Sequence, residues 1–170
     1  EPLIQEELKK YTFPSSLISI VHAPEVVEMD EPPIAATRQK KASSIRIALD
    51  LHRQGEVDAV VTAGNTGAAM AASKFVLKTL PGIDRPAIAT LIPSQLGYFI
   101  LLDVGANSDC KPLYLLQFAL MGSAYARLVL GPKEPRIALL NNGEEDLKGN
   151  QLSKEAYQLL DQSTLQFVGN

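Results

Sequence analysis

The sequence has few of the residues that most often perform covalent chemistry. It holds one cysteine, Cys110, two histidines, His22 and His52, and no tryptophan. A lone cysteine excludes an internal disulfide framework and is typical of a reducing compartment. No Ser-His-Asp or Cys-His unit is indicated, and no Cys/His cluster predicts a metal site. We therefore expect no metal and no cofactor, and we interpret these three residues as packing or surface residues.

Long apolar runs and an excess of one charge are also lacking. No stretch approaches the ~20 apolar residues that span a bilayer, and a net charge of −3 does not indicate nucleic acid as a partner. Hydrophobic residues make up 46% of the chain, as in an ordinary globular protein. The chain begins with Glu1 and ends at Asn170, directly after a strand-like run. We expect a single domain over residues 1–170 that forms an incomplete part of a longer chain.

The sequence alternates short apolar runs with helical patterns, which is typical of an α/β fold. Pro112 is expected to open a helix, Gly55 to end one, and Asn150 or Ser153 to cap one. The strands at 87–92 and 98–102 are joined by a short link and indicate one antiparallel pair. The predicted strands are 17–21, 58–62, 87–92, 98–102, 136–140 and 165–168, and the predicted helices are 34–54, 68–79, 112–129 and 153–160. We expect a three-layer α/β/α domain with a mostly parallel, Rossmann-like sheet.

Three polar, glycine-bearing loops each follow an apolar run. They occupy residues 63–67, 103–107 and 141–145. Parallel sheets gather their ligand-binding groups in the loops that follow the strands. Three such loops therefore predict one shared site built from backbone N–H groups, amides and carboxylates.

The first loop has the composition of an anion site. Gly64 and Gly67 flank Asn65 and Thr66 before a predicted helix. Glycine permits close approach to the backbone, and a helix N-terminus offers unpaired N–H groups. The pattern matches neither a P-loop nor a dinucleotide fingerprint. A common Gly-Asn-x-Gly turn without a ligand explains it equally well.

The second loop joins a carboxylate to an amide. Asp103 ends an apolar strand, Asn107 follows a Gly-Ala turn, and Lys111 is the nearest cation in sequence. Asp103 is expected to cap a helix, to brace a loop, or to work with a cation over an anion site.

The third loop is acidic. Glu144, Glu145 and Asp146 either bind a metal, orient cations or face solvent, and Lys148 partly offsets their charge. A separate basic run precedes the first loop in sequence. It is interpreted either as a solvated helix face or as a dock for an acidic partner, and it consists of Arg38, Lys40, Lys41 and Arg46.

Several longer motifs resemble one family. The stretches are residues 63–68 (AGNTGA), 81–87 (PGIDRPA), 101–107 (LLDVGAN), 117–119 (QFA) with 121–123 (MGS), 142–145 (NGEE) and 148–150 (KGN). Together they resemble the bacterial phosphate acyltransferases, the acyl-carrier-protein:phosphate acyltransferases of phospholipid synthesis. The resemblance covers nearly the whole chain.

This resemblance implies a fold, a reaction and partners. The fold is that of the isocitrate and isopropylmalate dehydrogenase-like superfamily. Inorganic phosphate attacks the thioester of a long-chain acyl carrier protein and gives an acyl phosphate, which a glycerol-3-phosphate acyltransferase then uses. Family members are homodimers, cytoplasmic and peripherally membrane-associated, and no nucleic acid takes part.

The same resemblance assigns residue roles. The catalytic candidates are Asn65, Asp103, Asn107 and Lys111, and the phosphate-binding candidates are Gly64, Asn65, Thr66, Gly67 and Lys148. The basic run Arg38, Lys40, Lys41 and Arg46 is the candidate dock for the carrier protein.

The chain also departs from the family pattern. Members are roughly twice as long, with an N-terminal Asp-Ala-Met-Gly-Gly-Asp-type loop and a C-terminal half that are missing here. Asn142 stands where an apolar residue is expected. Two alternatives stay open: a phosphotransacetylase-like acyl-CoA:phosphate transferase, and a non-catalytic fragment that only binds acyl carrier protein.

Overall fold

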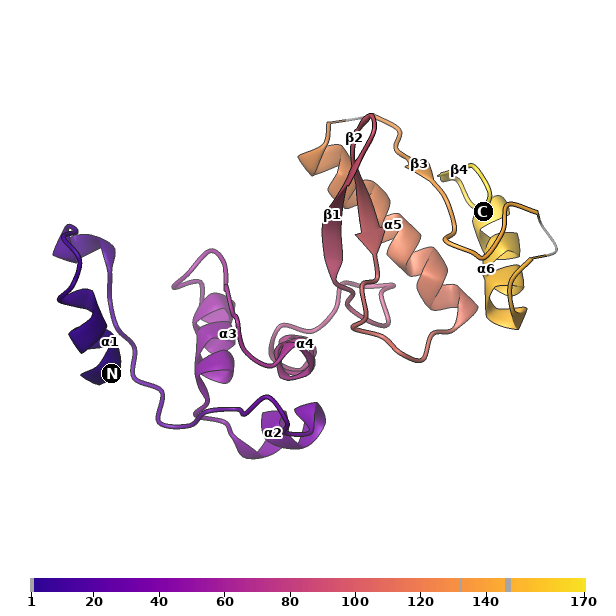
Figure 1. Cartoon of the computed structure of the whole chain (residues 1–170). Helices are drawn as coiled ribbons and strands as arrows, with labels where there is room; N and C mark the ends of the chain where they lie inside the picture. Colours follow the sequence, from indigo (N-terminus) through magenta and orange to yellow (C-terminus); the bar gives the residue numbers. More distant parts are fainter. Residues whose placement is uncertain (1, 132, 146–147) are drawn as a thin grey trace. The chain divides into compact units, whose positions relative to one another are not determined.

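The structure, a computed structural model, describes residues 2–131, 133–145 and 148–170. It divides into two compact units, Glu1–Lys78 (unit 1) and Thr79–Asn170 (unit 2), which we describe separately (Figure 1). The single domain predicted over residues 1–170 stays a prediction.

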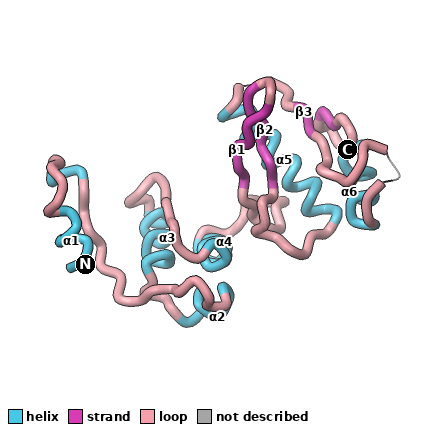
Figure 2. The backbone as a smooth tube through the Cα atoms, in the orientation of Figure 1, coloured by secondary structure: helices cyan, strands magenta, loops and turns pink. Residues whose placement is uncertain are grey.

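Unit 1 consists of helices joined by extended loops (Figure 2). Its elements are α1 (Pro2–Leu8), the 3-10 turn η1 (Ser15–Leu17), α2 (Pro33–Gln39), α3 (Ser44–Gln54) and α4 (Thr66–Val76). Helix α4 packs against both α2 and α3. The apolar core lies between α3 and α4 and comprises Ile45, Leu49, Ala68, Ala72 and Val76.

Local signals explain the bounds of α3. Ile45 and Leu49 lie four residues apart and are both buried, so one apolar face is turned to the core. Gly55 ends the helix at φ +77°, in the left-handed region that glycine adopts without steric cost. This confirms the predicted C-terminus.

The start of this helical region corrects the sequence prediction. One helix was expected from residue 34 to residue 54, but α2 and α3 are separated by residues 40–43. The Glu25 carboxylate accepts a hydrogen bond from Ala42 N at 2.7 Å, and Glu25 O accepts one from Ser44 N. These long-range partners take the amides that a continuous helix needs, so the helix breaks.

Two predicted strands of unit 1 are also corrected. Residues 18–21 and 58–62 do not form strands, and residues 15–17 form the turn η1. Their β-branched residues favour extended backbone, but a strand also requires a neighbour that completes its hydrogen bonds. The described residues of unit 1 supply only the isolated bridge between Glu25 and Ser43.

Unit 2 contains both described sheets. Strands β1 (Ala89–Ser94) and β2 (Gly97–Leu102) form an antiparallel hairpin in which Ala89 faces Leu102, which confirms the predicted pair. Helix α5 (Pro112–Val129) follows and contacts β2 (Figure 1). Pro112 stands at its start, as predicted.

The end of unit 2 is a short crossover. Strands β3 (Arg136–Ile137) and β4 (Gln166–Phe167) pair in parallel, joined through α6 (Gln151–Asp161). Asn150 caps α6 by accepting a hydrogen bond from Ser153 N at 3.0 Å, which selects Asn150 from the two predicted caps. Helices α5 and α6 pack together, and Phe118 and Leu160 are each 2% exposed.

These elements make the chain a mixed α/β protein. The predicted three-layer architecture with a mostly parallel sheet is not confirmed, because the described sheets are the antiparallel hairpin and the two-residue parallel pair. Within the described ranges, no helix combines the length and the apolar character needed to cross a membrane.

Candidate functional site

In the first loop, Asn65 is held by the fold on every side. Its side chain is 6% exposed, and Oδ1 accepts a hydrogen bond from Ala68 N at 2.9 Å, which caps α4. Nδ2 donates to three carbonyl oxygens at 3.0–3.3 Å, those of Glu28, Met29 and Glu31. Three acceptors already surround its two N–H protons, so the amide has no donor left for a ligand.

The glycines that flank Asn65 differ in what they do. A Cβ on Gly67 would lie 2.6 Å from Pro33 Cγ, so this glycine allows α2 to approach the first turn of α4. A Cβ on Gly64 would meet only ordinary contacts, 3.5 Å from Thr62 Oγ1. Thr66 is exposed at the first position of α4, and no described residue forms a hydrogen bond with its hydroxyl. Of this loop, Thr66 and the backbone around it remain accessible to an anion.

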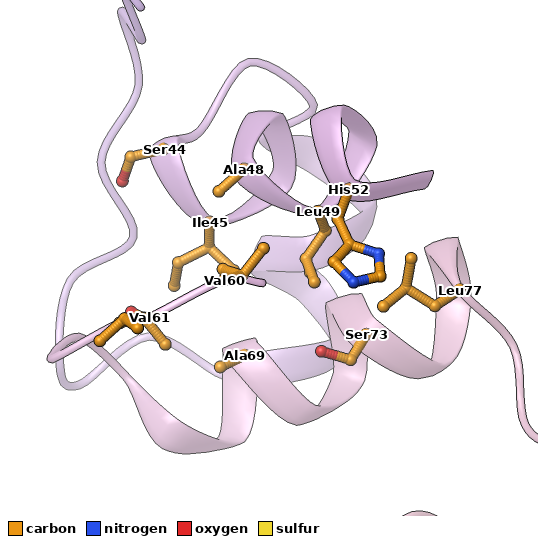
Figure 3. Close-up of a pocket in the computed structure, with 11 residues that line it drawn as sticks. Ser44, Ile45, Ala48, Leu49, His52, Val60, Val61, Ala69, Ser73 and Leu77 are labelled. Carbon is orange, nitrogen blue, oxygen red and sulfur yellow. The ribbon is translucent and has the colours of Figure 1, made fainter. Parts of the chain in front are cut away.

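An apolar groove lies beside this loop (Figure 3). It has a volume of about 460 Å³, and Figure 3 shows α3 and α4 on its two sides with the extended segment near residue 61 along it. The His52 imidazole lies near Leu77 in this view. The lining residues are Ser44, Ile45, Ala48, Leu49, His52, Val60, Val61, Thr62, Ala69, Ser73 and Leu77.

In the second loop, Asp103 and Asn107 brace each other. Asp103 Oδ2 accepts hydrogen bonds from Asn107 N at 2.8 Å and from Asn107 Nδ2 at 3.3 Å. Asp103 Oδ1 accepts one from Ile88 N at 2.8 Å, and Asn107 Nδ2 also donates to Pro86 O. The structure therefore brings these two predicted residues together, and Asp103 braces the loop, which was one of its predicted roles.

Two cations lie beside this loop, against one aromatic ring. Arg85 Cζ is 5.3 Å and Lys111 Nζ is 5.9 Å from the centroid of the Tyr114 ring. In the same region, buried Gln117 donates to Asp84 Oδ2 at 2.8 Å and accepts from Asp84 N at 3.0 Å. This arrangement joins the 81–87 turn to the start of α5.

Cys110 lies within the same group of residues. Burial raises the pKa of its thiol, the Asp103 carboxylate raises it further, and Arg85 opposes that rise. The thiol therefore stays protonated at neutral pH, which agrees with the interpretation of Cys110 as a packing residue.

The third loop is fixed by its own side chains. Asn141 Nδ2 donates to Lys148 O at 3.2 Å, and Lys148 Nζ lies 3.8 Å from Glu145 Oε1. Asn142 and Glu144 are exposed. Asp146, which was predicted to bind a metal, orient cations or face solvent, lies outside the described residues.

The predicted basic run divides into two kinds of residue. Lys40 forms an ion pair with Glu31, and Arg46 pairs with Asp50 at 2.9 Å while lying over the Phe75 ring. Arg38 and Lys41 are exposed. Arg38 and Lys41 form no ion pair with any described residue, so these two cations of the run fit the docking of an acidic partner.

The predicted site residues therefore fall into separate groups. Gly64, Asn65, Thr66 and Gly67 belong to unit 1, whereas Asp103, Asn107, Lys111 and Lys148 belong to unit 2. Within the described part of unit 2, no hydrogen bond or ion pair links the second loop to the third. The site shared by all three loops stays a prediction.

Sequence reasoning did not select Arg85, Tyr114 and Gln117. Arg85 belongs to the 81–87 motif, but the sequence indicated only a turn there and no functional role for the arginine. Tyr114 stands three residues after Lys111, a spacing that places the two on one face at the start of a helix. That spacing was the available signal.

These features define a mixed α/β protein whose polar loops adjoin an apolar groove in unit 1 and a cation pair in unit 2. The family model described as "Fatty acid synthesis protein" matches residues 2–170, and the chain belongs to that family. Curated relatives include the phosphate acyltransferases of Syntrophotalea carbinolica, 53% identical over 95% of this chain and 47% of the relative, and of Desulforamulus reducens, 55% identical over 91% and 46%. A third, from Syntrophomonas wolfei, is 48% identical over 100% and 54%. The chain spans about half the length of these relatives.

Proposed function

We propose that this chain is part of an enzyme that transfers an acyl group to phosphate. The proposal rests on the similarity of nearly the whole chain to relatives named phosphate acyltransferase, which are 53% and 55% identical to it. The name of these relatives specifies a phosphate and an acyl group. Direct transfer of an acyl group to phosphate requires no enzyme nucleophile, which is consistent with the lack of a paired nucleophile and base in the sequence.

The finer proposal concerns the substrates and the setting. The acyl donor is a long-chain thioester of acyl carrier protein, and the acyl phosphate product passes to a glycerol-3-phosphate acyltransferase. The complete protein is a homodimer that lies in the cytoplasm and associates peripherally with the membrane. Its sheet is completed to the three-layer, Rossmann-like α/β/α architecture. The resemblance of the motifs at residues 63–68, 81–87 and 101–107 supports these proposals.

The reaction needs little acid or base assistance. A phosphate oxygen attacks the thioester carbonyl, the C–O bond forms, the C–S bond breaks, and the thiolate leaves and takes a proton from water. Phosphate has a second pKa of about 6 and is largely a dianion at neutral pH, and a thiol near ~8.5 is a good leaving group. The enzyme must therefore supply alignment and donors to the tetrahedral oxyanion.

The geometry refines the role of each candidate. We assign donors to the oxyanion or phosphate to Thr66 and to the backbone at Gly64 and Gly67. Asn65 acts as a positioning residue, because its polar atoms already have partners within the fold.

In unit 2, Asp103 and Asn107 hold the second loop, and Lys111 supplies charge to the anion. Lys148 is assigned to charge neutralisation as well, with Glu145 as its present neighbour at 3.8 Å.

The docking proposal narrows to two exposed cations. Arg38 and Lys41 are assigned to contact with the acidic carrier protein, since Lys40 and Arg46 are paired with Glu31 and Asp50. Charge reversal by R38E with K41E is expected to weaken carrier binding, measured by titration calorimetry. The control variant R53E reverses an exposed arginine outside the basic run. Equal affinity for all three proteins would refute the assignment.

The experiment on function measures thiol release from palmitoyl carrier protein by this chain, with and without phosphate. Phosphate-dependent release, reduced about 10-fold or more in T66V, is expected because an oxyanion donor is worth that much or more. T66V keeps the shape of the exposed side chain and leaves the Asn65 cap intact. Faster release from acetyl-CoA would favour a phosphotransacetylase-like enzyme. Carrier binding without release would show a binding module instead.

A further inference from the structure

Two positive charges in unit 2 share one aromatic ring, and neither forms an ion pair with a residue that the structure describes. Arg85 and Lys111 both lie within 6 Å of the Tyr114 ring centroid, at 5.3 and 5.9 Å. Among the described residues, no carboxylate oxygen lies within 4.0 Å of either cation. A cation–π contact is worth only about 0.5–1 kcal/mol at an exposed site. The ring therefore positions the two side chains without neutralising them.

The carboxylates of the neighbouring loops are engaged by neutral donors. Asp103 accepts hydrogen bonds from the amides of Ile88 and Asn107, and Asp84 accepts one from Gln117. Asp109 is exposed and forms no ion pair among the described residues. In these hydrogen bonds the partners of Asp84 and Asp103 are backbone amides and two amide side chains, and neither Arg85 nor Lys111 takes part.

This pair of neighbouring positive charges favours the binding of an anion. Like charges beside one ring repel each other, and a bound anion removes that repulsion while it gains charge-assisted hydrogen bonds. Arginine presents a planar fork that matches a phosphate group, and lysine adds a mobile point charge. We propose that Arg85 and Lys111, positioned by Tyr114, bind the phosphate group of a substrate.

This inference rests on the proposed function for its ligand. Two sources supply the same chemistry: inorganic phosphate, which is the acyl acceptor, and the phosphate that joins pantetheine to a thioester carrier. Arg85 also acts electrostatically on the Cys110 thiol, where it opposes a rise in pKa. The positive charge of Arg85 therefore acts on a group inside the second loop, which places Arg85 close to that loop.

The test measures binding directly and needs no turnover. Inorganic phosphate and phosphopantetheine are titrated separately into the 170-residue chain by isothermal calorimetry. The variants are R85Q, K111Q and R85K. The control is R127Q, which removes an exposed arginine near the other end of α5. Circular dichroism and the urea midpoint establish that each variant is folded.

We expect R85Q and K111Q each to weaken phosphate binding about 10-fold or more, as loss of a charged hydrogen bond does. R85K should retain part of the affinity because it keeps the charge and loses the fork. R127Q should bind like the parent. Tighter binding of inorganic phosphate would assign the site to the acceptor, and tighter binding of phosphopantetheine would assign it to the carrier.

Two outcomes overturn the inference: no binding of either phosphate compound, or equal binding by R85Q, K111Q and R127Q. Thiol release tests the proposed function separately from this binding site. Binding that depends on Arg85 and Lys111 without thiol release would leave this site intact and refute acyl transfer by the chain. Phosphate-dependent thiol release with an unchanged KM for phosphate in R85Q would support acyl transfer by the chain and refute this phosphate site.

Discussion

Asn65 in unit 1 and Lys111 in unit 2 are both predicted site residues, yet their side chains differ in burial and in hydrogen-bond partners. Asn65 is buried, and each of its polar atoms has a partner within the protein. Lys111 is exposed beside a second cation, with an aromatic ring as its neighbour. The amide of the glycine-bearing loop in unit 1 thus holds the chain together, whereas Lys111 in unit 2 forms no ion pair with any described residue.

The largest effect expected from this comparison is on stability. Asn65→Ala removes a helix cap and the buried amide that donates to the carbonyl oxygens of Glu28, Met29 and Glu31, and we expect it to lower the free energy of unfolding by about 2–4 kcal/mol. Asn150→Ala removes the exposed cap of α6 alone and should cost about 1 kcal/mol. Urea unfolding of the two variants gives both values.

Asn65→Asp sharpens the result. The aspartate keeps an acceptor for Ala68 N but places a carboxylate against the carbonyls of Glu28 and Met29, so it should not restore stability. A cost for Asn65→Ala no larger than that for Asn150→Ala would refute a structural role for the carbonyl contacts.

The next largest effect compares two glycine-to-alanine substitutions that should change stability in opposite directions. Gly67→Ala places a methyl group 2.6 Å from Pro33 Cγ and should destabilise the protein by about 1–3 kcal/mol. Gly122→Ala in the interior of α5 meets no atom within 4 Å and should stabilise it by about 0.5–1 kcal/mol. Thermal unfolding of both variants measures the difference. Stabilisation by both would show that α2 does not pack closely on α4.

A smaller effect is expected on the Cys110 thiol. Its pKa is raised by burial first, then by Asp103, while Arg85 lowers it and Asp109 raises it. The thiolate should therefore form above the usual pH, and alkylation by iodoacetamide should be slow at neutral pH. Asp109→Asn should move the pH profile of alkylation downward and Arg85→Gln should move it upward. Shifts in the same direction for both variants would contradict this assignment of charges.

The smallest effect concerns acid stability in unit 1. Hydrogen bonding by the Lys40 ammonium, and then by the Glu28 backbone, lowers the pKa of Glu31 in the folded state. This group therefore contributes stability above the ordinary glutamate pKa of about 4.3, and the contribution is lost as pH falls through the lower folded value. Glu31→Gln should flatten the decline of the unfolding free energy in that acid range. An unchanged decline would indicate that the pair with Lys40 is solvent-screened.

Signals that act within a few residues of sequence predicted several helix ends and one hairpin correctly. Gly55 ends α3, Pro112 opens α5, Asn150 caps α6, and the hairpin of β1 and β2 is antiparallel as expected. Each depends on a backbone preference or on a partner close in sequence. The mixed α/β class follows from the same local patterns.

Contacts between distant residues were not predictable in this way. Asn65 reaches carbonyls more than 30 residues earlier, and Glu25 interrupts a helix 17 residues later. The apolar residues at 58–62 indicate an extended chain, but no sequence pattern names the neighbour that a strand requires. Of the candidate site, loop bracing by Asp103 was one of the predicted alternatives, whereas the position of Arg85 on Tyr114 depends on how a turn meets a helix.

The short parallel pair of β3 and β4 has a consequence for the order of folding. Arg136 and Gln166 are separated by α6 and its flanking loops, so joining them closes a loop of about 30 residues and costs chain entropy. Few hydrogen bonds offset that cost, among them Val168 N to Ile137 O at 2.8 Å and Leu139 N to Gly169 O at 2.9 Å. The hairpin and α5 should therefore form earlier, and the parallel pair should open first in the native protein. Deuterium uptake at the amides of Val168 and Leu139, faster than at the centre of α5, would record this opening as a separate step before global unfolding.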